Sequence, residues 1–505
     1  MTNRSYGNIV RVLTLALLTW SVAPAFAGDV DQRIRDLEER VGQLKPLEQE
    51  LEQLKAEQIE MKKEATAAAA AMPTFSYRPG NGVMIEAADK SWSFRTGIES
   101  HFRMLFESGL DQVGRTNGEI MARRFRPSFD YCIDNCLFDL EVILDLDGFG
   151  TGNAKNATGT SVGSILHRGA LNVHFEHLHP WLPTAQLGMD VSTSIGTSRQ
   201  GSSGTGTQAE YDLLSRNTFD DGRAGNGIVL NWDNKPLDGI GIPGRINRFQ
   251  VAMASVAEGD DGLSSFTDRK DFVTYIGIEP FSQLKNKWIS GLRPEMGAWF
   301  CNSDPQALSN ACGALKIQDL GNGGRQTLFN APNLGKGLAT LLMPGLSWEV
   351  GPYTLRVAGG FQRYTNSGGA TGKVEGNMFL IGHDLFLWSP KGFLTGSANT
   401  TGSVLFGTHF ERTDVSCTTA ARCSSLNGGQ FHRNRIILRE WDLYYFVAPR
   451  MSIGSSLLWY DAANLQTGTN NAAVNLGVCK TAAGACRPGS GGDWFDGMLN
   501  FRYQF

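Results

Sequence analysis

The chain has 505 residues with 46 Lys and Arg against 50 Asp and Glu, a formal net charge of −4 that does not indicate nucleic-acid binding. Glycine is abundant, at 60 residues against only 18 prolines, which favours a chain with many turns. After the first 27 residues no segment offers eighteen consecutive apolar residues, so a helical membrane protein is excluded.

Residues 1–27 predict a secretory signal peptide. Arg4 and Arg11 supply positive charge, residues 12–22 form a mostly apolar core, and residues 25–27 read Ala-Phe-Ala, a small-residue cleavage site. A transmembrane anchor is the alternative, but the core is too short to span a membrane. We therefore expect an exported chain that meets an oxidising environment.

Residues 28–65 predict a short α-helical coiled coil. The apolar positions follow steps of three and four: Val30, Ile34, Leu37, Val41, Leu44, Leu47, Leu51 and Leu54. The repeat skips at Leu47, beside Pro46, where we expect a local break. Only a partner helix can bury so narrow a seam, although a solitary solvated helix is the alternative. Residues 66–90 are expected to be a linker.

Residues 91–505 alternate with a period of two, the pattern of β-strands. In the third segment, for example, Phe138 and Leu140 alternate with Asp139 and Glu141. The sixteen predicted strands are 91–106, 119–132, 136–147, 165–176, 182–191, 226–233, 245–256, 271–280, 286–300, 337–351, 353–364, 376–388, 402–413, 435–448, 451–462 and 492–505. Charges on one face would destabilise a sandwich core but are tolerated in a water-filled lumen. We therefore predict an all-β fold, a 16-stranded antiparallel transmembrane β-barrel.

The end of the chain, "LNFRYQF", supports a membrane barrel. Phe501, Tyr503 and Phe505 share one face, which we expect to contact outer-membrane lipid and to serve as the C-terminal assembly strand for the barrel-assembly machinery. Connections between the predicted strands alternate between short and long, as periplasmic turns and external loops do. This predicts the cell outer membrane of a Gram-negative type, with the coiled coil in the periplasm.

The eight cysteines fall in four close pairs that predict local disulfides: Cys132 and Cys136, Cys301 and Cys312, Cys417 and Cys423, and Cys479 and Cys486. Zinc binding is the alternative, but no pair has the CxxC spacing. The last three pairs lie in or beside predicted external loops.

Histidines gather at the end of the fourth predicted strand. His174, His177 and His179 could ligate a metal if a turn brought them together, but histidine is also common at wet, interfacial positions, which is the favoured alternative. No cofactor is predicted. No GxSxG motif or other grouping of nucleophile and base occurs, so we expect no enzymatic activity.

Three stretches, "DKSWSFRTGIESHFRMLF", "MARRFRPSFDY" and "FDLEVILDLDG", carry a family resemblance. With the leader and the coiled coil before them, they make the chain similar to the phosphate-selective porin O and P family. The resemblance implies a homotrimer of sixteen-stranded porins whose third external loop, here 192–225, folds into the pore.

Five arginines are predicted to line the pore and to bind anions: Arg95, Arg103, Arg124, Arg126 and Arg168. Guanidinium forks suit phosphate or carboxylate. The favoured alternative is a set of ion pairs within the wall. The predicted function is passive diffusion of small hydrophilic solutes, with small anions or phosphate preferred. A structural protein that tethers the membrane to the cell wall through its coiled coil is the other hypothesis.

Overall fold

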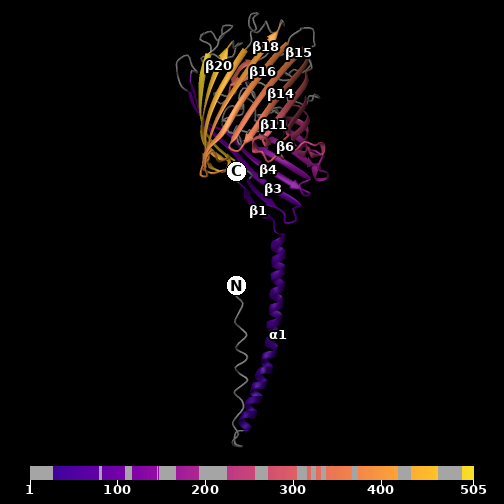
Figure 1. Ribbon diagram of the computed structural model, residues 1–505. Coiled ribbons are helices and arrows are strands. Elements are labelled where there is room, and N and C mark those ends of the chain that lie inside the picture. Colours follow the sequence, from indigo (N-terminus) through magenta and orange to yellow (C-terminus); the bar gives the residue numbers. More distant parts are fainter. Residues whose placement is uncertain are drawn as a thin grey trace, which may run out of the picture. The chain divides into compact units, whose positions relative to one another are not determined.

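The computed structural model describes residues 27–78, 82–108, 117–144, 146, 166–192, 224–255, 271–303, 316–319, 326–330, 337–366, 373–418, 434–463 and 492–504 (Figure 1). The chain divides into two units, Met1–Met72 and Pro73–Phe505. The first is helical and the second is built of strands. The predicted signal peptide and Phe505 lie outside the described residues.

The first unit contains one long helix, α1 (Ala27–Ala71). The helix continues through Pro46, so the expected break is wrong; a proline removes one backbone donor and need not end a helix. It also extends into the region expected to be a linker. Ile34, Leu37 and Leu51 of the heptad seam are exposed in the single chain, and the coiled coil itself stays a prediction. Among the described residues, no helix combines the length and apolar character needed to cross a membrane.

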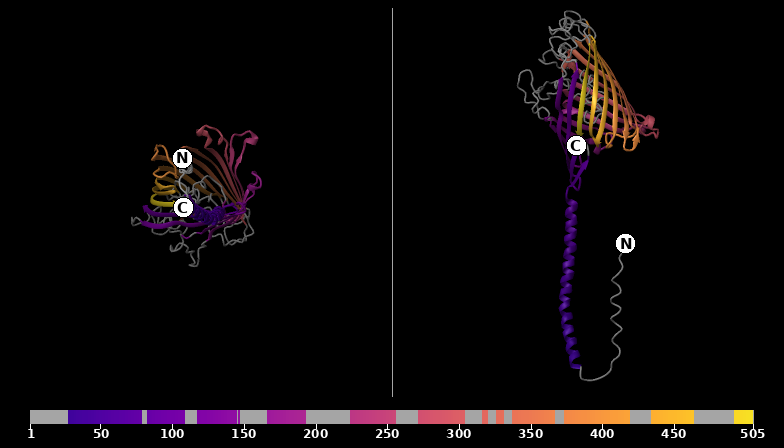
Figure 2. Two further views of the ribbon diagram at one scale, coloured as in Figure 1. Left: turned by 90° about the horizontal axis from the view of Figure 1, so that it is seen from below. Right: turned by 90° about the vertical axis from the view of Figure 1, so that its left-hand side faces the viewer.

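The second unit is a closed barrel of sixteen antiparallel strands (Figures 1 and 2). The strands are β3 (Trp92–Ser108), β4 (Asn117–Ile133), β5 (Phe138–Leu144), β6 (Leu166–His174), β7 (Thr184–Ser192), β8 (Ala224–Pro236), β9 (Arg245–Ser255), β10 (Asp271–Glu279), β11 (Leu292–Ser303), β14 (Gly337–Val350), β15 (Tyr353–Asn366), β16 (Lys373–Ser389), β18 (Val404–Thr418), β19 (Asn434–Ala448), β20 (Met451–Ala463) and β21 (Gly492–Gln504). Closure comes from β21, which pairs with β3 from Glu99↔Gln504 to Ser108↔Phe495. Every one of the sixteen predicted strands is confirmed.

Five short strands and one short α-helix lie outside this prediction. One of the strands, β17 (Gly392–Phe393), pairs with the end of β16. β1 (Thr74–Arg78) and β2 (Gly82–Glu86) form a hairpin within the expected linker, and β2 pairs with residues 93–96 of β3, on the edge that β21 leaves free. β12 (Lys316–Asp319) and β13 (Gln326–Asn330) form a separate sheet. The predicted strand at 286–300 begins late because α3 (Lys287–Ser290) occupies its start, with Asn286 as its N-cap.

The two ends of the barrel differ in their connections. We call the end where β14 joins β15 and β19 joins β20 through two residues the short-turn end, and the opposite end the long-loop end. Side chains alternate between the two faces of the wall. On β3, Phe102 and Phe106 are exposed on the outer face, whereas His101 and Arg103 are buried on the inner face. The predicted polar inside and apolar outside are confirmed on this strand.

The inner face is not polar everywhere. A buried apolar cluster covers the inner side of β8–β16: Val229, Ala252, Ala254, Val273, Trp299, Cys301, Ala339, Leu341, Met343, Ala358, Met378 and Leu380. The strands here are apolar on both faces, as Leu341 (buried) and Leu342 (exposed) illustrate. The inner face therefore combines an apolar region on these strands with the charged positions that the sequence indicated.

Candidate functional site: the inner wall of the barrel

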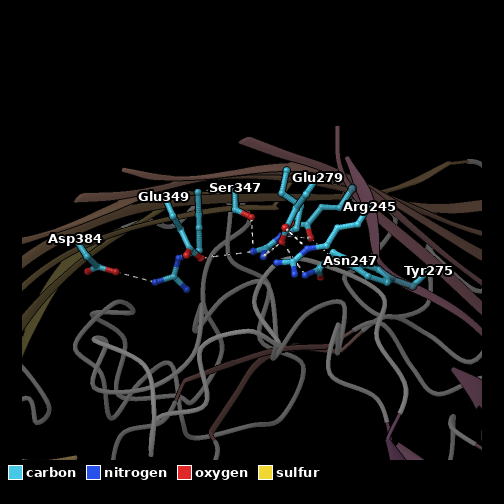
Figure 3. Close-up of polar contacts among 10 residues, drawn as sticks. Arg245, Asn247, Tyr275, Glu279, Ser347, Glu349 and Asp384 are labelled. Atoms are coloured by element: carbon cyan, nitrogen blue, oxygen red, sulfur yellow. Dashed lines mark hydrogen bonds and ion pairs between the residues drawn. The ribbon is translucent and has the colours of Figure 1, made fainter. Parts of the chain in front are cut away.

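A polar belt runs along the inner wall of β9–β16 near the short-turn end. Its charged members are Arg245, Glu279, Arg293, Glu295, Glu349, Arg356 and Asp384. Figure 3 shows the labelled Arg245, Glu279, Glu349 and Asp384 projecting from one side of the wall together with Asn247, Tyr275 and Ser347. Each of these strands contributes at least one side chain that faces the lumen near the short-turn end. Because solutes entering from this end would meet the belt, it is the candidate site for selectivity.

The start of the belt depends on a β-bulge in β9. Arg248 pairs with Gly277 of β10 and Ile246 with Ile278, so Asn247 is an extra residue. The bulge turns Arg245 to the inner face, where its Nε donates to Oε2 of Glu279 at 2.6 Å. The Asn247 amide donates to Oε1 of the same carboxylate at 2.8 Å. Strict alternation from Arg248 would place Arg245 outside, which is why the sequence did not indicate it.

Arg293 lies at the centre of the belt. Its Nη2 donates to Oγ of Ser347 at 2.6 Å. Its guanidinium nitrogens lie 3.7 Å from Glu279, 3.9 Å from Glu295 and 3.9 Å from Glu349. Tyr275 donates its hydroxyl hydrogen to Glu295 from the neighbouring strand. One arginine thus faces three carboxylates, two of which are nearly buried.

The network continues toward the last strands of the barrel. Arg356 Nη2 donates to Asp384 Oδ2 at 2.8 Å. His409 Nε2 lies 3.3 Å from Asp384 Oδ1 and 3.6 Å from Asp442 Oδ2, and all three side chains are almost fully buried. Asp442 in turn accepts a hydrogen bond from Ser456. The sequence did not indicate this network, because only the register of β15–β20 brings its members together.

The barrel's closing seam carries a network of the same kind. The Tyr444 hydroxyl accepts hydrogen bonds from Arg502 Nη2 at 2.8 Å and from the Asn500 amide at 3.0 Å. Oδ1 of Asn500 accepts from Arg103 Nε at 3.3 Å and lies 2.9 Å from His101 Nε2. These contacts join β19, β21 and β3, so polar inner side chains hold the first and last strands together.

The structure spreads the predicted arginines along the wall. Arg95 pairs in register with Asp130, and Arg126 with Glu99. Arg95 and Arg103 are eight residues apart on β3, which corresponds to about 26 Å along the strand. The arginines therefore form a ladder and cannot all contact one small anion.

Two of the other predicted arginines occupy distinct surroundings. Arg124 pairs in register with His101, and its side chain lies outside the described part of the structure. Arg168 Nη1 lies 3.2 Å from Glu141 Oε1, with both side chains about one-fifth exposed. Arg168 thus occupies a wall ion pair, the alternative that we favoured from the sequence.

The clustered histidines have other partners. Nδ1 of His174 lies 2.9 Å from Oε1 of Glu176, the rings of His174 and His177 stack at 5.6 Å, and Nδ1 of His179 accepts from the Trp181 backbone. Partial burial raises the pKa of Glu176, but hydrogen bonds from Thr184 and His174 outweigh it, so this pKa lies below its ordinary value. Within the described side chains, no group of three residues is suited to hold a metal ion.

The cysteine prediction is confirmed for one pair. Cys132 and Cys136 form a disulfide that closes the turn between β4 and β5, with Cα atoms 4.9 Å apart. Asp134 and Asn135, between them, adopt positive φ angles of 54° and 52°, which suits so tight a turn. Cys301 is also disulfide-bonded. The other five cysteine side chains (Cys312, Cys417, Cys423, Cys479 and Cys486) are not among the described side chains, so their pairings stay predictions.

The C-terminal strand has the predicted face pattern. Asn500 and Arg502 are buried on the inner side, while Phe501 and Tyr503 alternate with them on the outer side. The Phe501 ring lies 6.4 Å from that of Phe102 on β3. The role of Phe501, Tyr503 and Phe505 in assembly stays a prediction.

No family model matches the chain, and no curated protein matches it. Solved structures similar to it include the outer membrane channel DcaP of Acinetobacter baumannii, with 8% identity over 82% of this chain and 98% of that chain and a TM-score of 0.48. OmpT, an outer membrane protein of Vibrio cholerae, has 9% identity over 82% and 100%, with a TM-score of 0.46. Salmonella typhi OmpF has 8% identity over 86% and 100%, with a TM-score of 0.42. We draw no inference from similarities this weak. The barrel is established by the pairing of its own strands.

Proposed function

We propose that this protein is an outer-membrane porin, a water-filled channel for passive diffusion of small hydrophilic solutes. The observation that supports this most directly is a closed sixteen-stranded barrel with ion-paired side chains on its inner wall and apolar side chains on its outer wall. Sixteen strands enclose more space than side chains fill, and buried charges are tolerated where water reaches them.

The outer face supports a location in the outer membrane. On β21, Phe495 and Tyr503 flank the exposed Leu499 on the outer side. The nine residues from Phe495 to Tyr503 cover about 20 Å along the barrel axis at a tilt of about 40°, close to the apolar band of about 25 Å that such barrels present. Aromatic residues at both margins of an apolar band are typical of this location.

The charges of the belt do not favour anions. It contains four carboxylates (Glu279, Glu295, Glu349 and Asp384) against three arginines (Arg245, Arg293 and Arg356). A preference for small anions or phosphate must therefore come from the opposite wall, where Arg103, Arg124 and Arg126 form part of the arginine ladder. Such a preference is local and electrostatic, so it weakens as salt screens it over about 10 Å at 0.1 M.

We propose that the protein assembles as a homotrimer whose α1 helices form a coiled coil in the periplasm. In a single chain Ile34, Leu37, Leu51 and Leu54 of the seam are exposed. Helices from other copies of the chain would bury this seam. The resemblance to the phosphate-selective porin O and P family implies the same stoichiometry.

Conductance measurements distinguish a diffusion channel from a structural protein that tethers the membrane to the cell wall. A variant lacking residues 29–72 is inserted into a planar lipid bilayer beside the full chain. The porin predicts stepwise currents of equal size from both proteins, because the barrel alone forms the channel. A folded barrel that never conducts, in either form, would contradict the porin and favour a structural tether.

A further inference from the structure

The hairpin of β1 and β2 has an apolar outer face. Register places Phe75 of β1 beside Ile85 of β2, and Ile85 beside Phe94 of β3, so the three side chains form one row. Phe94 lies eight residues before Phe102, an even separation, so both point to the outer face of the strand. Directly opposed residues share a face, and the whole row therefore faces outward.

This face is uncovered on β1 in the single chain. Phe75 is 74% exposed, and Tyr77, two residues further along on the same face, is 52% exposed. Val83, the register partner of Tyr77, is half-buried. At the other side of the face, the Phe94 ring stacks on that of Phe129 with centroids 6.4 Å apart. The apolar surface that remains open to solvent is therefore concentrated on β1.

The row lies beyond the reach of the membrane that we propose around the barrel. Tyr503, at the margin of the apolar band, pairs with Ser100 of β3. Phe94 is six residues further toward the short-turn end, about 15 Å along the axis at a tilt of about 40°. The headgroup layer adds only about 5–8 Å on each side of the apolar core. Lipid therefore does not cover this row.

The chain itself connects the hairpin closely to the seam of α1. Leu54, Met61 and Met72 are separated by seven and then eleven residues, one heptad and one heptad plus a step of four, so they extend the same seam. Met61 and Met72 are exposed in the single chain. Only Met72 and Pro73 separate α1 from β1, so β1 begins within about 11 Å of the last helical Cα atom.

A second copy of the chain is thus the partner that the seam brings to the hairpin. Cyclic symmetry makes the helices of a trimeric coiled coil parallel, so three hairpins begin beside one axis. Each hairpin then meets its neighbours with an apolar, aromatic face that neither its own chain nor lipid covers. Water against such a face is unfavourable, and burial between copies removes it.

We propose that the β1–β2 hairpins of three copies pack against one another by their outer faces and form an apolar collar where each chain passes from α1 to the barrel. The inference rests on the proposed homotrimer and names the surface that joins its copies outside the membrane. Phe75 and Tyr77 make the central contacts, because rigid aromatic side chains contribute strongly to interfaces.

The direct test places the photocrosslinker p-benzoylphenylalanine at position 75 of the full-length protein in its membrane. Illumination should link the chain to itself and give covalent dimers and trimers. Position 393 is the matched control, because Phe393 is 72% exposed and lies at the same end of the barrel outside the hairpin, and it should give monomers. Links from position 75 to lipid or to another protein alone, or equal self-linking from both positions, would overturn the proposal.

A second test measures the stability of the trimer. Phe75→Glu should raise the protein concentration at which half of the trimers dissociate, measured by native mass spectrometry in mild detergent, by about tenfold or more, because each copy loses the burial of an apolar ring. Phe75→Leu should recover most of the loss, and Phe393→Glu should dissociate as the unaltered protein does. An unchanged dissociation of Phe75→Glu would contradict the collar. Since Phe75 is exposed in the single chain, the urea midpoint of the Phe75→Glu barrel should not move.

The two proposals can fail separately. An unaltered protein that is monomeric in mild detergent would refute both the homotrimer and the collar. A stable trimer whose chains never crosslink from position 75 would refute the collar alone. All variants should conduct as the unaltered protein does, because the hairpin residues that change lie on the outer face and not in the lumen.

Discussion

Replacing Arg293 with alanine should both destabilise the barrel and shift its selectivity toward cations. The Arg293 and Glu279 side chains are each 11% exposed, and that of Glu295 is 1% exposed. Removal of one partner from a buried ion pair costs about 3–5 kcal/mol, because the remaining charge stays desolvated. Arg245 still pairs with Glu279, and Tyr275 still donates to Glu295, so we expect the lower value, about 3 kcal/mol.

The matched control is Arg248→Ala. Arg248 donates to Asp233 at 2.7 Å, but these side chains are 37% and 40% exposed, so the loss should be no more than about 1 kcal/mol. Urea unfolding of the barrel in lipid vesicles, followed by tryptophan fluorescence, gives both free energies of unfolding. In the Arg293→Ala background, Glu279→Gln with Glu295→Gln should recover at least half of the loss. Equal stability of the Arg293→Ala and Arg248→Ala variants would refute the reasoning.

Three other changes test separate parts of the account. Arg124→Ala/Arg126→Ala should move the reversal potential toward cations and weaken block of chloride current by phosphate; unchanged selectivity would make the arginine ladder a set of wall ion pairs. Cys132→Ser should lower the free energy of unfolding by about 2 kcal/mol, because the disulfide with Cys136 closes only a short loop, and a barrel whose urea midpoint does not move would count against this. Deletion of residues 29–72 should leave the conductance unchanged but reduce the trimer fraction by native mass spectrometry, whereas an intact trimer would show that α1 does not support assembly.

Much of the barrel could be predicted from the sequence, because alternation over seven to seventeen residues is a strong signal for a two-faced strand. The hairpin of β1 and β2 was missed although it had a signal, the "PGNG" turn residues between two short segments. It was overlooked because strands of five residues show little periodicity. In sequence, a hairpin with strands this short has no pattern that distinguishes it from a linker.

The polar belt was only partly predictable, because its geometry depends on register. The Asn247 bulge reverses the face of Arg245, and nothing in the local sequence marks it. Asp384, His409 and Asp442 lie on three different strands, and pairing alone brings both carboxylates within 3.6 Å of the His409 ring. Alternation assigns a residue to a face but does not say which residues of neighbouring strands lie beside it.

Single-channel recording tests the central claim most directly. The full-length protein is inserted into a planar lipid bilayer under a gradient of potassium chloride, and the current and its reversal potential are measured. We predict stepwise, long-lived openings and a small reversal potential on the anion-selective side, because the charges of the described belt are largely paired and the preference comes from the arginine ladder alone. A correctly folded protein that produces no current steps would contradict the proposed channel.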